Sequence, residues 1–106
     1  MDGSGRLGRF EEIVLLALVR LGENAYGVTI RREIAERTGR DISFGSVYTS
    51  LERLARKGYV SPRMGEPTPE RGGRAKRYFE IEAPGLHALN QSREIVARLE
   101  GLVHAQ

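Results

Sequence analysis

The two histidines are the side chains best suited to acid–base chemistry or metal binding, and their placement argues against both uses. His87 and His104 are not three or four residues apart, which is the spacing that brings two ligands to one helix face. The chain has no cysteine, which excludes thiolate metal sites, cysteine nucleophiles and disulfides. The segment Gly72-Gly73-Arg74 lacks the Lys-Ser/Thr pair of a phosphate-binding loop. We therefore expect no enzyme, no metal site and no cofactor.

Binding of a polyanion is the other chemistry that the sequence offers, because its positive charge is concentrated. The formal net charge is only +3, but residues 71–79 carry four basic residues and no acidic one. These are Arg71, Arg74, Lys76 and Arg77. Such a segment is either a solvated loop that opposes aggregation or a contact for a phosphate backbone. The elements on either side of it decide between these two interpretations.

Apolar spacing predicts a first helix that starts near Phe10 and stops at Gly22. Residues 10, 13, 14, 17, 18 and 21 are apolar and fall on one helix face. Leu15, Leu16 and Val19 add apolar residues beyond that face. A helix that is apolar nearly all round is either central in the domain or covered by a partner chain.

Two further helices are predicted before the basic segment. The second covers about 27–38 and ends at Gly39. Ser43 is a good N-cap for the third, because its hydroxyl can accept a hydrogen bond from a first-turn amide. The buried stripe of this third helix is expected to be Phe44, Val47, Leu51, Leu54 and Ala55, and Gly58 ends it. Its opposite face is polar.

The basic segment lies between two predicted strands. Residues 59–64 and 76–82 are rich in strand-forming side chains, and Pro62 places the first strand at an edge or distorts it. Residues 65–75 contain three glycines and two prolines and are expected to form a loop. The two strands and the loop therefore predict a β-hairpin.

A last helix is predicted over 84–103, since proline is tolerated in a first turn. Leu89, Val96 and Val103 recur every seven residues, with Leu99 between them. This stripe can pack on its own domain or on a partner. A lone helix after a hairpin has little core of its own chain to join, which favours a second copy of the chain.

Three helices, a hairpin and a final helix are the element order of a winged helix-turn-helix. We predict a mainly α (α+β) fold with a two-stranded β-hairpin wing and a C-terminal dimerisation helix. Residues 1–6 are expected to be a disordered tail, 7–82 the winged-helix DNA-binding domain, and 83–106 the dimerisation helix. The longest apolar run is far shorter than the roughly 20 residues of a membrane helix, and no secretory leader follows Met1. We expect no membrane partner and a cytoplasmic location.

In this fold the third helix has the right width for the major groove of DNA. Gly45, Ser46 and Thr49 are small and polar, so the start of the helix can approach base edges. Arg53 lies nearly three turns into the helix and is better placed for the DNA backbone. The hairpin loop would bring its arginines to the adjacent backbone or minor groove.

Three segments, in this order, resemble the PadR family of bacterial transcriptional regulators. They are Ala25-Tyr26-Gly27, then 43–60 with its Ser-x-Gly-x-x-Tyr start and Leu-x-x-Leu-x-x-x-Gly end, then 73–81 with Gly-Arg-Ala-Lys-Arg-Tyr. The resemblance covers about 7–103, and the single C-terminal helix is like that of the shorter members. It implies a dimer that binds operator DNA, usually as a repressor, with the C-terminal helices paired. It also implies release by an inducer or by a changed dimer angle.

These arguments give two sets of predicted site residues. The DNA-binding set is Ser43, Gly45, Ser46, Tyr48, Thr49, Arg53, Arg71, Arg74, Lys76, Arg77 and Tyr26. The dimerisation set is Leu89, Val96, Leu99, Leu102, Val103 and Leu16. Ser43 also has a capping role, Tyr48 a role in core packing, and Tyr26 a role in shaping the entry to the second helix. The surplus apolar residues of the first helix suggest an inducer pocket between that helix and the last one.

The predicted function is a PadR-like regulator that reads an inverted-repeat operator as a homodimer, with half-sites about one helical turn apart, roughly 34 Å. Two alternatives stay open. One is a winged helix used as a protein-interaction module in a larger assembly. The other is a ligand-sensing dimer whose DNA binding is weak or lost. A steep loss of affinity for DNA with added salt would favour the regulator, and a flat response the interaction module.

Overall fold

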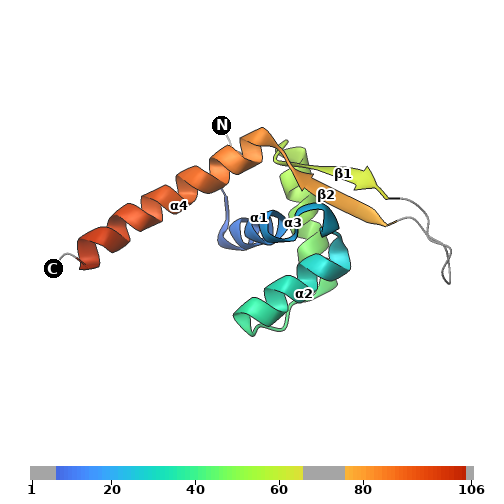
Figure 1. The fold of residues 1–106 in the computed structure, drawn as a ribbon, viewed down its shortest axis with the longest axis horizontal. Helices are drawn as coiled ribbons and strands as arrows, with labels where there is room; N and C mark the ends of the chain where they lie inside the picture. Colours follow the sequence, from blue (N-terminus) through green and yellow to red (C-terminus); the bar gives the residue numbers. More distant parts are fainter. Residues whose placement is uncertain (1–6, 66–75, 105–106) are drawn as a thin grey trace.

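The computed structural model describes residues 7–65 and 76–104. Its elements are α1 (Arg9–Leu21), the 3-10 turn η1 (Gly22–Asn24), α2 (Gly27–Thr38), α3 (Phe44–Arg56), β1 (Val60–Met64), β2 (Arg77–Ile81) and α4 (Ala83–His104) (Figure 1). The order and the mainly helical content are those predicted, and the ends of the elements differ from the prediction by one residue at most. The tail expected over 1–6 and the tip of the wing lie outside the described residues.

Two glycines set the ends of α1 and α2. Gly22 has φ 60° and Gly39 has φ 71°, a region of backbone conformation that side chains with a Cβ atom rarely adopt. The amide of Gly39 donates to the carbonyl of Ala35 at 2.9 Å and closes the last turn of α2. These two stops allow the three helices to turn back on one another.

The core lies where α1, α2, α3 and the hairpin meet. Its fully buried large side chains are Val14 and Leu15 of α1, Ile30 of α2, Val47, Leu51 and Leu54 of α3, and Leu89 of α4. Leu15 therefore faces the core and is not one of the surplus apolar residues that a partner would cover. Phe44 was predicted in the buried stripe of α3, but it is 44% exposed. The buried stripe begins one turn later, at Val47, and the Phe44 ring is covered only in part, by the guanidinium of Arg31.

The hairpin is tied to the connector between α1 and α2. Strands β1 and β2 pair antiparallel, from Val60 opposite Ile81 to Met64 opposite Arg77. Beside them, the amide of Phe79 donates to the carbonyl of Ala25 at 2.8 Å, and Tyr26 bridges to Tyr78. The connector therefore acts as a short third partner of the sheet and fixes the wing relative to the start of α2.

Helix α4 starts on the body and then leaves it as an arm (Figure 1). Gly85 lies against the backbone carbonyl of Tyr59, where a Cβ atom would overlap it, and Leu89 is only 2% exposed. The core thus extends across the predicted domain boundary at 82/83. Past Leu89 the helix is exposed on most sides, and the radius of gyration is 15.5 Å, against about 13 Å for a compact chain of this length.

Within residues 7–65 and 76–104, no helix combines the length and the apolar character needed to cross a membrane. The same part of the chain holds no group of three acidic or histidine side chains that could bind a metal ion.

Candidate nucleic-acid interface

The first two turns of α3 form an exposed tip of small polar residues. The Ser43 hydroxyl accepts a hydrogen bond from the amide of Ser46 at 3.1 Å, which confirms the predicted cap. The two serine hydroxyls also lie 3.0 Å apart. Gly45, Ser46 and Thr49 are all exposed, so no other described part of the chain covers this tip. The tip offers hydroxyls and a close backbone approach rather than long charged side chains.

Tyr48 joins the edge of this tip to the start of α2. Its phenol lies against Gly27, where the Cβ atom of any other residue would overlap the hydroxyl oxygen. Tyr48 is nevertheless 39% exposed. Both predicted roles are therefore compatible with the geometry, since the ring packs on α2 while its edge remains open to solvent. The packing also accounts for the glycine of the Tyr-Gly pair.

The base of the wing is a stack of two aromatic rings and two cations. The rings of Tyr26 and Tyr78 meet edge-on, with centroids 5.2 Å apart. The Lys76 ammonium lies 4.8 Å from the Tyr26 ring centroid, and the Arg63 guanidinium lies 4.8 Å from that of Tyr78. Sequence reasoning had placed Tyr26 and Lys76 in the site but had not connected them.

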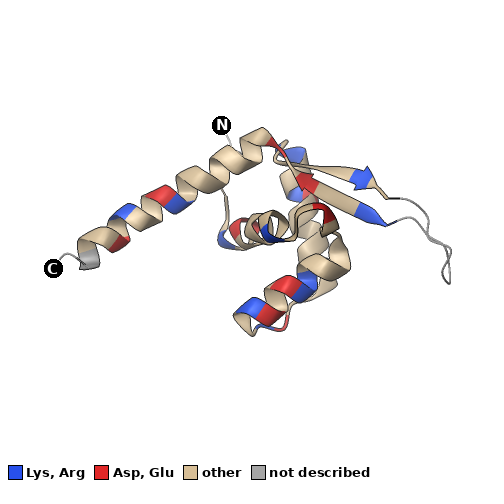
Figure 2. Ribbon diagram, viewed as in Figure 1, with Lys and Arg blue, Asp and Glu red and all other residues tan. Residues whose placement is uncertain are grey.

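The two cations of this stack are in different electrostatic states. Arg63 lies 3.4 Å from the Glu80 carboxylate and donates to the carbonyl of Glu23 at 3.2 Å. Among the described residues no carboxylate lies within ion-pair distance of Lys76, whose charge is available to a phosphate. Figure 2 shows basic positions on both strands towards the loop end of the hairpin. Arg77 of β2 is among them and is exposed.

A hollow lies between α3 and the start of α1, and the tip residues Ser43, Gly45, Ser46 and Thr49 line part of it. Arg53 lines it together with Lys57 and Glu11. The Lys57 ammonium lies 2.9 Å from one Glu11 oxygen, and the Gly8 amide donates to that same oxygen at 2.8 Å. Burial by itself raises the pKa of the Glu11 carboxyl, but the Gly8 amide, Lys57 and the charge of Arg53 together bring that pKa below its ordinary value. The pair fastens α1 to the end of α3.

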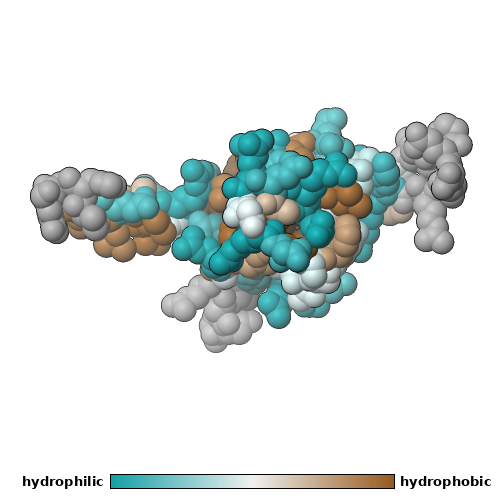
Figure 3. All heavy atoms as spheres, turned by 90° about the horizontal axis from the view of Figure 1, so that it is seen from below, coloured by the Kyte–Doolittle hydropathy of each residue, from teal (hydrophilic) through white to brown (hydrophobic). Residues whose placement is uncertain are grey.

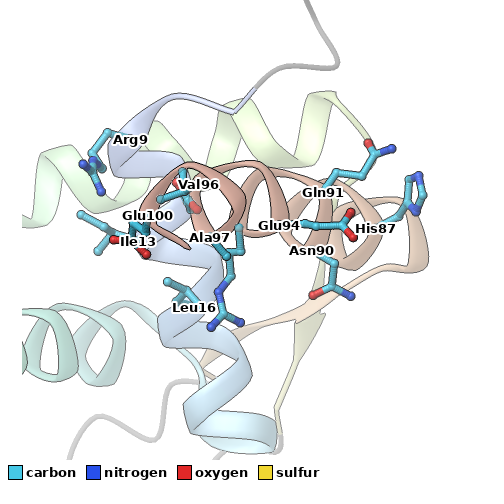
Figure 4. A pocket seen from close by; sticks show the side chains of 12 residues that line it. Arg9, Ile13, Leu16, His87, Asn90, Gln91, Glu94, Val96, Ala97 and Glu100 are labelled. Carbon is cyan, nitrogen blue, oxygen red and sulfur yellow. The ribbon is translucent and has the colours of Figure 1, made fainter. Parts of the chain in front are cut away.

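A second hollow separates α1 from the arm of α4 (Figure 4). Ile13 and Leu16 project into it from α1, and Val96 and Ala97 from α4. Charged and polar side chains make up the rest of the lining: Arg9, Glu12, His87, Asn90, Gln91, Arg93, Glu94 and Glu100. Of the three surplus apolar residues that suggested a pocket here, only Leu16 lines it, because Leu15 is buried and Val19 borders a different hollow beside the hairpin.

The arm carries a row of exposed apolar side chains, seen as a brown patch beside the grey C-terminal end in Figure 3. The row consists of Ile95, Val96, Leu99 and Leu102, each between 49% and 64% exposed. Leu89 shares the seven-residue spacing with Val96, but it belongs to the core of its own chain and has no surface to offer a partner. Its assignment to the dimerisation set is corrected accordingly. Val103 is within α4, but its side chain is not among those described.

The structure gathers most of the described members of the predicted DNA-binding set into two groups, and Arg77 lies beside the second group on β2. Ser43, Gly45, Ser46 and Thr49 form the α3 tip, and Tyr48, Tyr26 and Lys76 surround the start of α2. Arg53 lies four residues beyond Thr49 in α3 and lines the same hollow as the tip residues. Arg71 and Arg74 lie outside the described residues. Sequence reasoning missed Phe44 and Arg31, which contact each other at the α3 tip with 5.2 Å between guanidinium carbon and ring centroid.

Comparisons with known proteins bear on what this arrangement does. The family model described as the transcriptional regulator PadR-like family matches residues 15–91. Similar solved structures include a PadR-like transcriptional regulator from Bacillus cereus, with 19% identity, a TM-score of 0.73, and coverage of 91% of this chain and 88% of that one. Another is a transcriptional regulator from Clostridium thermocellum, with 22% identity, a TM-score of 0.70 and the same coverage.

A third similar structure is Bacillus subtilis PadR in complex with operator DNA. It has 22% identity and a TM-score of 0.61, with coverage of 78% of this chain and 47% of that chain. At such identities the likeness establishes a shared fold, and it confirms the predicted winged helix-turn-helix. No curated protein matches the chain.

Proposed function

The chain belongs to the PadR-like family of transcriptional regulators, and we propose that it binds operator DNA as a homodimer and represses transcription. In this proposal α3 enters the major groove, and the wing contacts the flanking backbone or minor groove. The protein would act in the cytoplasm by occluding a promoter. The similar B. subtilis PadR structure contains operator DNA, which supports the same partner for this chain.

The observation that carries the proposal is the uncovered α3 tip. A helix fits the major groove only if its outward face is free and its first residues are small enough to approach the base edges. Ser43, Gly45, Ser46 and Thr49 meet both conditions. The hydroxyls can donate to or accept from base edges, and the first-turn amides favour a phosphate nearby.

The wing would supply cations that contact the phosphate backbone and so position the protein on the duplex. Lys76 is the best-defined of these, because the Tyr26 ring holds its side chain and no described carboxylate neutralises it. Arg77 is exposed on the same strand, and we propose that Arg71 and Arg74 extend this basic surface. Contacts of this kind position a protein on DNA without reading its sequence.

Dimerisation is proposed through the arm. The row Ile95, Val96, Leu99 and Leu102 is too apolar to be left in water along one face of an exposed helix. A second copy, related by a two-fold axis, would bury this row against its own and fill the hollow between α1 and α4. Two α3 tips would then face half-sites about one turn apart, roughly 34 Å, on an inverted repeat.

An inducer would bind at the same α1–α4 hollow. Its lining combines apolar side chains such as Leu16 and Val96 with charged ones such as Arg93 and Glu94. A small molecule with an apolar body and a charged group would suit it better than a purely apolar compound. Binding there would change the angle between the two arms and so the spacing of the α3 tips.

Selection of bound fragments from a random duplex pool tests the proposal. We expect enrichment of an inverted repeat, and we expect Ser46→Ala to change the preferred bases while Lys76→Ala weakens binding to all sequences alike. Met64→Ala, at an exposed apolar side chain of β1, serves as a control. A pool without any enriched sequence, from protein that is folded and dimeric, would favour the protein-interaction alternative.

A further inference from the structure

An exposed strip of apolar side chains follows the edge between α2 and α3. It consists of Val28, Phe44 and Tyr48, which are 40%, 44% and 39% exposed. Phe44 and Tyr48 are four residues apart and so lie on one face of α3. Tyr48 packs on Gly27, and Val28 is the next residue of α2. It borders the small polar residues of the α3 tip and lies far from the arm, so dimerisation through α4 does not account for it.

Arg31 fixes the Phe44 ring at this edge. Its guanidinium carbon lies 5.2 Å from the ring centroid. The same guanidinium donates from Nε to the Ile42 carbonyl at 2.5 Å and lies 3.6 Å from the Asp41 carboxylate. Arg31 is therefore committed to the turn before α3 and to one face of the ring. The remainder of the ring stays open beside the polar tip, at the first residue of α3.

The chemistry of the major groove leaves one kind of partner for such a ring. Base edges there present hydrogen-bond donors and acceptors, and the only apolar group among them is the 5-methyl of thymine. None of the small side chains at the tip can form a two-bond contact with guanine or adenine as Arg, Lys, Asn or Gln would. An apolar contact is thus the strongest source of base discrimination that this end of α3 offers.

We propose that Phe44 reads the 5-methyl group of a thymine in each half-site, and that Arg31 is a positioning residue for its ring. This inference rests on the proposed function, because it requires α3 to enter the major groove. It adds a specificity-determining residue and the chemical group that it recognises.

Deoxyuridine substitution isolates the proposed contact, because it removes only the methyl group. In a duplex recovered by selection, each thymine is replaced in turn by deoxyuridine, and affinity is measured for wild type and variants. We expect one position per half-site at which wild type loses about three- to fivefold in affinity, the value for one buried methyl group. Phe44→Ala should bind thymine and deoxyuridine equally at that position, and Phe44→Leu should keep part of the difference.

Two further variants separate a direct contact from a structural role. Arg31→Gln, which loses the cation but keeps a hydrogen-bond donor near the Ile42 carbonyl, should reduce the thymine preference. Met64→Ala removes a more exposed apolar side chain, on β1, and should leave that preference unchanged. Circular dichroism checks that each variant is folded.

The possible failures are distinguishable. If wild type binds no duplex at all, the proposed function is wrong and this inference falls with it. If wild type binds DNA but no thymine is sensitive to loss of its methyl group, only the inference is wrong. The same holds if Phe44→Ala retains the full thymine preference, which would assign the methyl contact to Val28, to Tyr48 or to Thr49.

Discussion

At the scale of single residues, the Glu11–Lys57 pair makes stability depend on pH. The pKa of Glu11 is lower in the folded chain than its ordinary value of 4.5. The stabilisation is therefore complete above the ordinary pKa and is lost as the pH falls through the lowered, folded-state pKa. We expect Glu11→Gln to reduce the free energy of unfolding by about 2 kcal/mol at neutral pH, because the half-buried Lys57 ammonium loses its contact with the Glu11 carboxylate.

Urea denaturation of wild type and Glu11→Gln at a series of pH values checks this prediction. The difference in the free energy of unfolding between wild type and Glu11→Gln should become smaller as the pH falls. Glu36→Gln, on the exposed side of α2, is the matched control and should show no such gap. A difference that stays constant from neutral to strongly acid pH would contradict the assignment.

Two glycines of α4 should respond oppositely to alanine, although both lie in the same helix. Gly85 abuts the backbone of Tyr59, which cannot move aside, whereas nothing lies within 4 Å of the position that a Cβ atom would take at Gly101. Gly85→Ala should therefore destabilise the protein by about 1–3 kcal/mol through overpacking. Gly101→Ala should stabilise it by up to about 1 kcal/mol, because alanine is the better helix former. Thermal unfolding of both variants tests this, and a change in the same direction for both would contradict the close packing of Gly85 against Tyr59.

At the scale of elements, the predictions succeeded where a local signal marks a boundary. Gly22 and Gly39 end helices and Ser43 caps one, so the bounds of α1, α2 and α3 follow from neighbouring residues. Contacts between segments that are distant in the chain have no such local signal in the sequence. The hydrogen bond from the Phe79 amide to the Ala25 carbonyl joins two backbone groups, so no pattern of side chains in the sequence predicts it. Phe44 shows the same limit, since periodicity places it in the buried stripe but cannot show how far the rest of the chain covers that stripe.

The tether between wing and connector yields a prediction at this scale. Tyr78 contacts Tyr26 edge-on and Arg63 over its face, so Tyr78→Ala should loosen the hairpin from the start of α2. We expect a several-fold loss of affinity for all duplexes, together with a shallower salt dependence, because Lys76 is no longer held beside the backbone.

Fluorescence titration with labelled duplex at several salt concentrations measures both quantities. Tyr78→Phe keeps the ring and should bind as wild type does. Unchanged affinity and unchanged salt dependence in folded Tyr78→Ala would show that the wing does not rely on this contact.

At the scale of the whole molecule, the described part of the chain leaves the apolar row of its arm exposed. The seven-residue spacing in α4 indicated an apolar stripe from the sequence alone, but not where the chain's own core stops covering it. The body of the chain buries Leu89 but leaves Val96 exposed, so the core stops covering the stripe between these two residues. The corrected surface for a partner is thus shorter than predicted and is confined to the outer half of the helix.

The double variant Val96→Asp, Leu99→Asp tests this surface. Two carboxylates in the apolar row should abolish pairing, so that sedimentation gives the 11.8 kDa mass of one chain where wild type gives twice that mass. The matched control, Arg98→Gln, changes an exposed charged side chain of the same helix that does not line the α1–α4 hollow, and it should remain dimeric. Should the Asp variant also remain dimeric, α4 would not be the dimer contact.

Salt dependence of duplex binding by the unmodified protein tests most directly whether this molecule is built to hold DNA. The α3 tips and wings of a dimer should together neutralise several phosphates. The logarithm of the association constant should then fall linearly with the logarithm of the salt concentration, with a slope of several units. An association constant that does not change with salt, or no detectable binding at low salt by a folded dimer, would contradict the account.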